Sequence, residues 1–393
     1  MIKTALQTNL IVLTTLLLSI TLNSAETEKK ILLVKEAMYR EAHADLHGMR
    51  ILQNQLIRDY PNENIGYLLK LNSAIGRFSW DINNSELDSE IQNTAEKILS
   101  VARESFKINR AERLLASGQA YFALSYLKAV RGSYLQASTN GSKGIRDLEQ
   151  ALFIDPTLLD AKLHLGAAYY FAANLPPFIK VLSNYVWFIP SGDEEMGLLY
   201  LEEVAGSDSS LRIVAKYMLS SFLLRGSSEA REQATAILEE LIKEFPENGR
   251  FYLRQISQLA ESGKYEETLS TIQRFLTPSE CCIRPTRDIA FAQVWKSVAL
   301  VHLGQTKEAE HTLSQIGETA ISKFPNWGRI WYWLISAKTY DKLGESNQAV
   351  QNYTKIITAS EATLVPSHLL LSLIHISEPT RRTPISYAVF CLK

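Results

Sequence analysis

The fold is decided by the stretch Lys342-Leu-Gly-Glu-Ser-Asn-Gln-Ala-Val350, which has two earlier counterparts in the chain. These read Glu261-Ser-Gly-Lys-Tyr-Glu-Glu-Thr-Leu269 and His302-Leu-Gly-Gln-Thr-Lys-Glu-Ala-Glu310. Each contains a glycine followed five positions later by a small residue: Gly263 and Thr268, Gly304 and Ala309, Gly344 and Ala349. Glycine adopts the left-handed conformation that ends a helix, and a small residue lets a second helix approach the first. The pattern therefore predicts repeated helical hairpins.

The last copy extends over a longer set of spaced large and small residues: Trp333, Ala337, Tyr340, Gly344, Ala349, Tyr353 and Ile356. This spacing resembles the tetratricopeptide repeat, a helix-turn-helix unit of about 34 residues. An earlier copy contains Ala234 and Leu238 and ends at Glu244-Phe-Pro-Glu-Asn248, and others end at 155–156 and 59–64. The resemblance covers most of 30–360 and is strongest from residue 209 onward. The last three small residues are 41 and 40 positions apart, so we expect enlarged loops.

The resemblance implies an all-α fold, a right-handed α-solenoid of stacked hairpins. Apolar spacing and caps predict further helices, with one or two in 30–59 and one each in 65–80, 86–108, 110–130 and 157–172. No stretch alternates at period two for long enough to require a strand. We divide the chain into a signal segment, an N-terminal helical region of degenerate repeats, a solenoid, a truncated helix and a foreign tail: 1–25, 26–109, 110–360, 361–370 and 371–393.

Both ends differ from the repeat region. One lysine, an apolar run over 10–22 and the small residues before Glu26 are typical of a signal peptide, with an uncleaved anchor as the alternative. We therefore expect an exported protein, located in the periplasm. The tail 371–393 resembles a translated sequencing adapter, because 371–381 and 385–392 match two adapter stretches in one reading frame. We expect the natural sequence to depart from this one near Leu370.

An apolar insertion interrupts the repeats over 174–192. It begins with Asn174-Leu-Pro-Pro177, which breaks a helix because proline lacks the N–H group. It continues with a very apolar stretch that contains only Lys180 as a positive charge, so a plug inside the solenoid is favoured over a helix on a membrane surface. The segment 174–190 also supports an alternative function, in which the protein carries an apolar or lipid ligand. From Glu194 to Ala205 the sequence predicts the second helix of a hairpin.

The composition excludes several classes of protein. Lys and Arg total 41 against 42 Asp and Glu, and this near-zero balance argues against nucleic acid as a partner. A hydrophobic share of 46% excludes a disordered chain. Cys281 and Cys282 are adjacent, which does not make a zinc site, and we interpret them as two thiols near a loop, with a redox role as the alternative.

Few titratable residues converge in the way a catalytic or metal site requires. The strongest candidate is His43-Ala-Asp-Leu-His47, whose spacing puts both imidazoles on one face of a helix. It lacks the glutamate that zincins carry after the first histidine, and no third ligand is apparent, so solvated helix surface is the preferred interpretation. His302 has no titratable companion in the sequence. We therefore predict no catalytic, metal or cofactor-binding residue, no cofactor and no enzyme activity.

The aromatic stretch Asn326-Trp-Gly-Arg-Ile-Trp-Tyr-Trp333 is the most distinctive segment. Trp327 and Trp331 share one side of the predicted helix, and Lys338 lies further along it. They either pack on a neighbouring helix or line a groove as interface anchors. The resemblance implies a scaffold that binds a protein or peptide on its concave surface, and these three residues are our candidates for that contact. Membrane contact is possible but not favoured.

Overall fold

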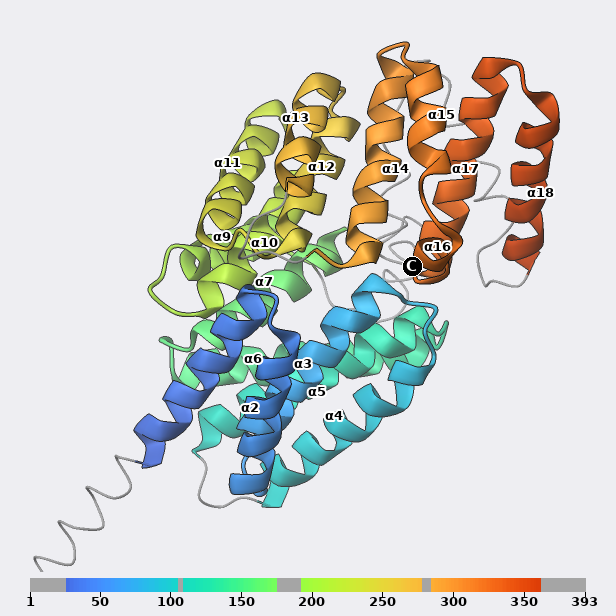
Figure 1. Ribbon diagram of the computed structural model, residues 1–393. Helices are drawn as coiled ribbons and strands as arrows, with labels where there is room; N and C mark the ends of the chain where they lie inside the picture. The colour runs from blue at the N-terminus through green and yellow to red at the C-terminus, as the bar shows by residue number, and fades with distance from the viewer. Residues whose placement is uncertain (1–25, 105–108, 175–191, 278–283, 362–393) are drawn as a thin grey trace, which may run out of the picture.

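The computed structural model describes residues 26–104, 109–174, 192–277 and 284–361. Every regular element in these residues is a helix, so the described part of the chain is all-α (Figure 1). None of these helices combines the length and the apolar character that crossing a bilayer would take. The signal segment, most of the insertion, the adjacent cysteines and the tail after residue 361 lie outside the described residues.

The described part of the chain begins with a helix over residues 26–42, which Figure 1 leaves unlabelled and which we call the N-terminal helix. The labelled helices of the first half are α2 (Leu46–Asp59), α3 (Ile65–Trp80), α4 (Glu86–Glu104), α5 (Arg110–Val130), α6 (Tyr134–Ile154) and α7 (Leu159–Ala173). Those of the second half are α9 (Glu194–Ala205), α10 (Leu211–Leu223), α11 (Ser228–Glu244), α12 (Gly249–Glu261), α13 (Tyr265–Leu276), α14 (Thr286–His302), α15 (Thr306–Ser314), α16 (Glu318–Ser322), α17 (Asn326–Leu343) and α18 (Ser346–Glu361).

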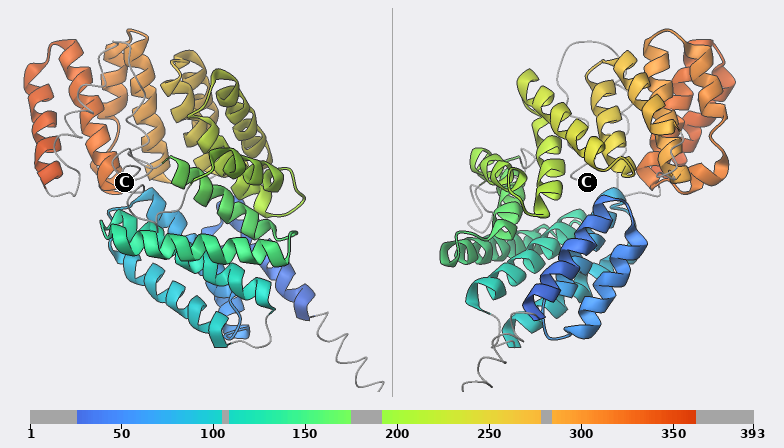
Figure 2. Two further views of the ribbon diagram at one scale, coloured as in Figure 1. Left: turned by 180° about the vertical axis from the view of Figure 1, so that it is seen from behind. Right: turned by 60° about the vertical axis from the view of Figure 1, so that its left-hand side comes forward.

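The helices pair into hairpins that follow one another along the chain: α3/α4, α5/α6, α7/α9, α10/α11, α12/α13, α14/α15 and α17/α18. The second helix of each hairpin packs on the first helix of the next, as α4 does on α5, α9 on α10 and α13 on α14. This stack is an α-solenoid of the tetratricopeptide-like type that the spacing predicted. Figure 2 shows the stack turning, so that the N-terminal and C-terminal hairpins form two arms of one curved body.

The curvature of the stack defines an inner surface. First helices of successive hairpins pack against each other, with α3 on α5, α5 on α7, α12 on α14 and α14 on α17. In the described part of the chain, no comparable packing joins the second helices of successive hairpins. Helices on the inside of a curve lie closer together than those outside. The first helices, α14 and α17 among them, therefore form the inner surface.

The glycine turns and the small residues are confirmed. Gly263, Gly304 and Gly344 have φ values of 75°, 80° and 77°, the left-handed region that favours glycine. At the end of α17, the N–H groups of Gly344 and Glu345 donate to carbonyls of the last helical turn, which closes the helix. The three small residues, Thr268, Ala309 and Ala349, are all at most 1% exposed. They lie where the two helices of a hairpin meet.

Within two of the hairpins, the two helices approach each other even more closely, because both helices have a glycine where they meet. A Cβ on Gly166 of α7 would lie 2.9 Å from the carbonyl oxygen of Gly197 in α9. A Cβ on Gly144 of α6 would lie 3.1 Å from the carbonyl oxygen of Gly118 in α5. Helices α7 and α9, which form one hairpin, are the helices that flank the insertion in the sequence. Whether that insertion forms a plug concerns 175–191, which the described residues do not include.

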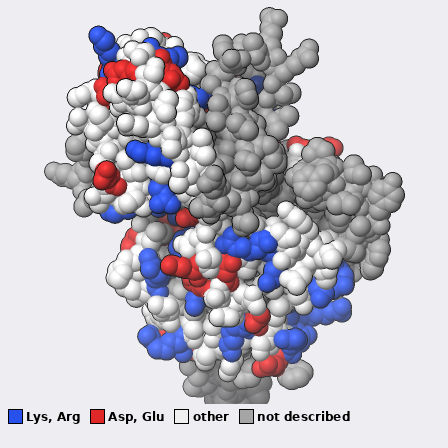
Figure 3. Space-filling view, turned by 90° about the vertical axis from the view of Figure 1, so that its right-hand side faces the viewer, with Lys and Arg blue, Asp and Glu red and all other residues white. Residues whose placement is uncertain are grey.

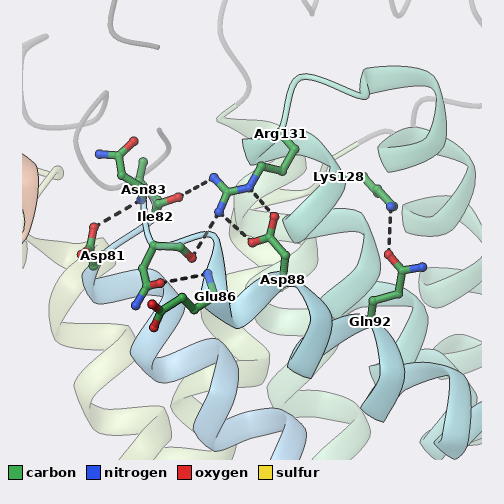
Figure 4. Close-up of polar contacts among 9 residues, drawn as sticks. Asp81, Ile82, Asn83, Glu86, Asp88, Gln92, Lys128 and Arg131 are labelled. Atoms are coloured by element: carbon green, nitrogen blue, oxygen red, sulfur yellow. Dashed lines mark hydrogen bonds and ion pairs between the residues drawn. The ribbon is translucent and has the colours of Figure 1, made fainter. Parts of the chain in front are cut away.

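A half-buried arginine clamps the N-terminal hairpins (Figure 4). Arg131, in the turn after α5, places Nε and Nη2 each 2.7 Å from the carboxylate oxygens of Asp88 in α4. Its guanidinium also donates to the carbonyl oxygens of Ile82 and Asn84 in the α3–α4 turn. A helix end leaves carbonyl groups without an intrahelical partner, and this side chain supplies their hydrogen bonds. The clamp fixes hairpin α3/α4 on hairpin α5/α6.

Candidate functional site

An aromatic cluster joins α14 and α17 on the inner surface. The Phe291 ring of α14 stacks on Trp327 and Trp331 of α17, with centroids 5.3 Å and 6.1 Å apart. Trp295, one turn further along α14, lies 4.7 Å from Trp331. Phe291 is buried, whereas the three tryptophans are half-buried. The cluster therefore packs two hairpins together and still leaves part of each indole accessible.

A glycine in the first turn of α17 makes this approach possible. A Cβ on Gly328 would lie 2.8 Å from the Phe291 ring, closer than real Cβ contacts allow. Phe324, which precedes α17, stacks on the same ring with the centroids 4.1 Å apart. The sequence around Trp327 thus encodes a socket for Phe291. Because the Phe291 ring packs against both indoles, this packing holds the side chains of Trp327 and Trp331 in place.

Three groups that can carry positive charge lie further along the same helices. Burial lowers the pKa of the Lys338 ammonium, which is half-buried on α17. Partial burial and the nearby Lys342 and Lys338 lower the pKa of His302 at the end of α14. One face of the His302 ring is covered by Tyr265 of α13, with the centroids 4.5 Å apart. His302, which the sequence left without a titratable companion, therefore lies beside two lysines that favour its neutral form.

Charge elsewhere on the molecule is mixed. On the face in Figure 3, basic and acidic side chains are interspersed over the lower part, while the described upper part carries charge at its top and lower edges and is largely uncharged between them. Helix α18 contributes to this neutral area, because Lys355 is its sole charged residue before Glu361. The lysines of α17 therefore stand beside a helix with little charge of its own.

The structure places the three predicted partner-binding residues on one helix and beside α14. Trp327 and Trp331 both contact the α14 rings, and Lys338 lies two turns beyond Trp331 beside His302. Sequence reasoning missed Phe291 and Trp295. The repeat contained a signal for Phe291, because Ala309 and Ala349 are 40 residues apart and the same offset carries Trp331 onto Phe291.

One local prediction is wrong. His43 and His47 do not share a helix face, because the N-terminal helix ends at residue 42 and Ala44 has a φ of 60°. The Asp45 carboxylate accepts a hydrogen bond from the Gly48 N–H and so caps the start of α2. The end of one helix and the cap of the next thus separate the two imidazoles. In the described residues, no three His, Cys, Asp or Glu side chains gather in a way that could hold a metal ion.

No known family model matches the sequence. Among solved structures, the chain is similar to the one titled "Crystal Structure of the Yeast Tom70", with 12% sequence identity and a TM-score of 0.29. The match covers 92% of this chain and 91% of that one. At this identity and TM-score the likeness is too weak to transfer any property of that protein.

Proposed function

We propose that this protein is a non-enzymatic scaffold that holds a partner protein or peptide against the inner surface of its C-terminal hairpins. In this proposal the chain is exported and acts in the periplasm, and the partner-binding residues include Trp327, Trp331 and Lys338. Stacked hairpins present an extended surface, and a rigid surface lowers the entropic cost of ordering an extended partner.

The observation that carries the proposal is the half-buried tryptophan cluster on the inner helices. Trp295, Trp327 and Trp331 are held in place by one another and by Phe291, yet each keeps an accessible part. Pre-positioned tryptophan is the residue type most often found at the energetic centre of protein interfaces. An apolar side chain of the partner would contact the exposed edges of these rings.

The neighbouring cations support a partner that carries acidic residues. Lys338 and Lys342 both lie close enough to His302 to lower its pKa, so an acidic group placed there would be attracted by both ammonium groups. Charge complementarity of this kind fixes the register of a bound segment and speeds its association. The proposed partner is therefore a segment with an apolar side chain followed or preceded by a carboxylate.

The absence of enzyme activity and the export are parts of the proposal that rest on the sequence. The motifs that would indicate a nucleophile, a phosphate-binding loop or a zinc site do not occur in it. The signal segment 1–25 has the charge and apolar pattern of an export signal.

The experiment is a comparison of partner recovery by charge-reversed variants. The tagged chain is used to purify proteins from the envelope fraction of its source cells, and the partner is then titrated against each variant. Lys338→Glu is expected to weaken binding about ten-fold, since a lost interface contact costs about 1.4 kcal/mol. Lys355→Glu is the matched control, because Lys355 is exposed on the outer helix α18. It should bind as the unchanged chain does.

A second variant tests the aromatic part of the site. Trp331→Ala should weaken the same binding by more than ten-fold, and circular dichroism reports whether helicity persists. Equal binding by the Lys338 and Lys355 variants, with helical Trp331→Ala also binding normally, would rule out this surface as the partner site.

A further inference from the structure

The N-terminal helix is attached at both ends to turns that lie far apart in the chain. Near its start, Lys30 Nζ lies 2.8 Å from the Glu63 carboxylate and 5.1 Å from the centroid of the Tyr60 ring. Both residues belong to the α2–α3 turn. Near its end, Ala42 shares a buried cluster with Phe245 of the α11–α12 turn. The helix, dark blue in Figure 1 and Figure 2, therefore bridges the two turns.

The contact at the far end is specific. The Asn248 Nδ2 group donates a hydrogen bond to the carbonyl oxygen of Ala42 at 2.9 Å. His43 Nδ1 lies 3.0 Å from Glu247 Oε2, and the His43 ring meets Phe245 edge-on with centroids 5.0 Å apart. A backbone hydrogen bond, a polar pair and an aromatic contact thus converge on one turn of the solenoid.

The contact continues back along the helix. The hydroxyl group of Ser210, just before α10, lies 3.4 Å from the Met38 sulfur atom. Burial raises the pKa of the Glu41 carboxyl, and the Arg250 guanidinium of α12 opposes that rise. The last turns of the N-terminal helix are thus covered by residues from α10 to α12, more than 160 positions later in the chain.

Such a contact is not needed to build the stack. In a solenoid each repeat buries its apolar face against its neighbours alone. The hairpins from α3/α4 to α10/α11 already form an unbroken series of neighbours. The N-terminal helix adds a second connection, from the start of the series to its middle, and so fixes the angle through which the intervening hairpins turn.

One polar atom in the far-end contact has no hydrogen bond. His43 Nε2 is buried and has no hydrogen-bond partner. A buried polar atom without a partner weakens the contact that contains it. Small, partly polar contacts of this kind separate more readily than the apolar interiors of the hairpins.

We propose that the N-terminal helix is a strap that holds the N-terminal hairpins and the α10–α12 hairpins at a fixed angle. Release of its far end from residues 245–248 lets the two parts of the solenoid move relative to one another. The strap thereby sets the opening between the N-terminal arm and the C-terminal arm.

The test measures the distance between the two arms in the full chain. Spin labels are attached through cysteines at Asn93 of α4 and Gln351 of α18, both exposed, after the native cysteines have been changed to serine. Ala42→Glu places a charge in the far-end contact, where Ala42 is 5% exposed. Leu32→Glu is the matched control, because Leu32 lies on the same helix and is 60% exposed. The distance distribution is read by pulsed electron resonance, and helicity by circular dichroism.

We expect Ala42→Glu to keep its helicity and to show a broader distance distribution that extends to longer distances. Leu32→Glu should match the unchanged chain. An unchanged distribution for Ala42→Glu would overturn the proposal. If Ala42→Glu fails to fold, the paired change His43→Ala and Glu247→Ala decides. A folded chain with a broadened distribution supports the strap, whereas a narrow distribution or unfolding of the C-terminal hairpins contradicts it.

Discussion

Replacing Arg284 by methionine should lower the free energy of unfolding by about 3 kcal/mol, because hydrogen bonds from a charged group to partly buried carbonyl oxygens are among the strongest in proteins. Its Nη1 and Nη2 atoms lie 2.8 Å and 2.7 Å from the carbonyl oxygens of Glu247 and Pro246. Its guanidinium also lies 4.8 Å from the centroid of the Phe275 ring. Methionine keeps the apolar stem and removes these hydrogen bonds.

The effect is large because three parts of the chain meet at this arginine. It joins the α11–α12 turn, the end of α13 and the start of α14, and the same turn also binds the end of the N-terminal helix. Arg131 performs the corresponding task in the N-terminal hairpins, again by donating to carbonyl groups in a turn between helices. Loss of Arg284 should therefore loosen the strap as well as the hairpin.

The matched control is Arg274→Met. Arg274 also lies near the Tyr252 ring, but it pairs with Glu239 on the surface, where both side chains are more than two-fifths exposed. Exposed ion pairs contribute about 0–1 kcal/mol, so this change should have little effect on unfolding by urea. Equal losses from the two variants would show that the carbonyl contacts of Arg284 do not hold the junction.

Replacing Gly197 by alanine should destabilise the protein by about 2–3 kcal/mol, although alanine favours a helix more than glycine does by about 1 kcal/mol. The new Cβ would lie 2.8 Å from the carbonyl oxygen of Gly166 and 2.9 Å from the Tyr170 nitrogen. These are backbone atoms of α7, so relief requires the two helices to separate. The free energy of unfolding is measured by urea denaturation followed by circular dichroism.

Gly76→Ala provides the control with the opposite sign. Gly76 lies inside α3, and a Cβ there would meet nothing within 4 Å. Alanine should stabilise the protein at this site by up to about 1 kcal/mol. For Gly144→Ala, the new Cβ would lie 3.1 Å from its nearest backbone atom, so the change in the free energy of unfolding should fall between those of the other two variants. If Gly197→Ala stabilised the protein as Gly76→Ala does, the close approach of α7 and α9 would be wrong.

The parts of the fold that local chemistry determines could be predicted from the sequence. The left-handed turn at Gly344 and the buried Ala349 follow from residue type alone, because few other residues fit those positions. The predicted segments 65–80 and 110–130 agree with α3 and α5 to the residue. In these helices the apolar spacing and the caps point to the same boundaries.

The contacts that depend on the turning of the stack could not be predicted. His43 meets Glu247 across 204 positions, and nothing near either residue indicates the other. The break at Ala44 was also hidden, since alanine favours helix and its left-handed conformation is imposed by the Asp45 cap and the docking of His43.

Only part of the candidate site could be predicted from the sequence. Trp327 and Trp331 were distinctive as residues, and their common side followed from helical spacing. Phe291 on α14 required the offset of 40 residues between repeats, and the closeness of Lys338 and Lys342 to His302 required the arrangement of α13, α14 and α17 in space. The sequence predicted which residues of the helix form the expected interface, but it did not predict which residues of other helices lie beside them.

The most direct test of the central claim is site-specific photo-cross-linking in the source cells. A benzophenone amino acid is placed at Lys338 on the inner helix α17, and in a separate chain at Val350, which is 63% exposed on the outer helix α18. If the inner surface of the C-terminal hairpins binds the partner, illumination will join one protein species to position 338 and not to position 350. Cross-links at position 350 with none at position 338, or the same products from both, would contradict the claim.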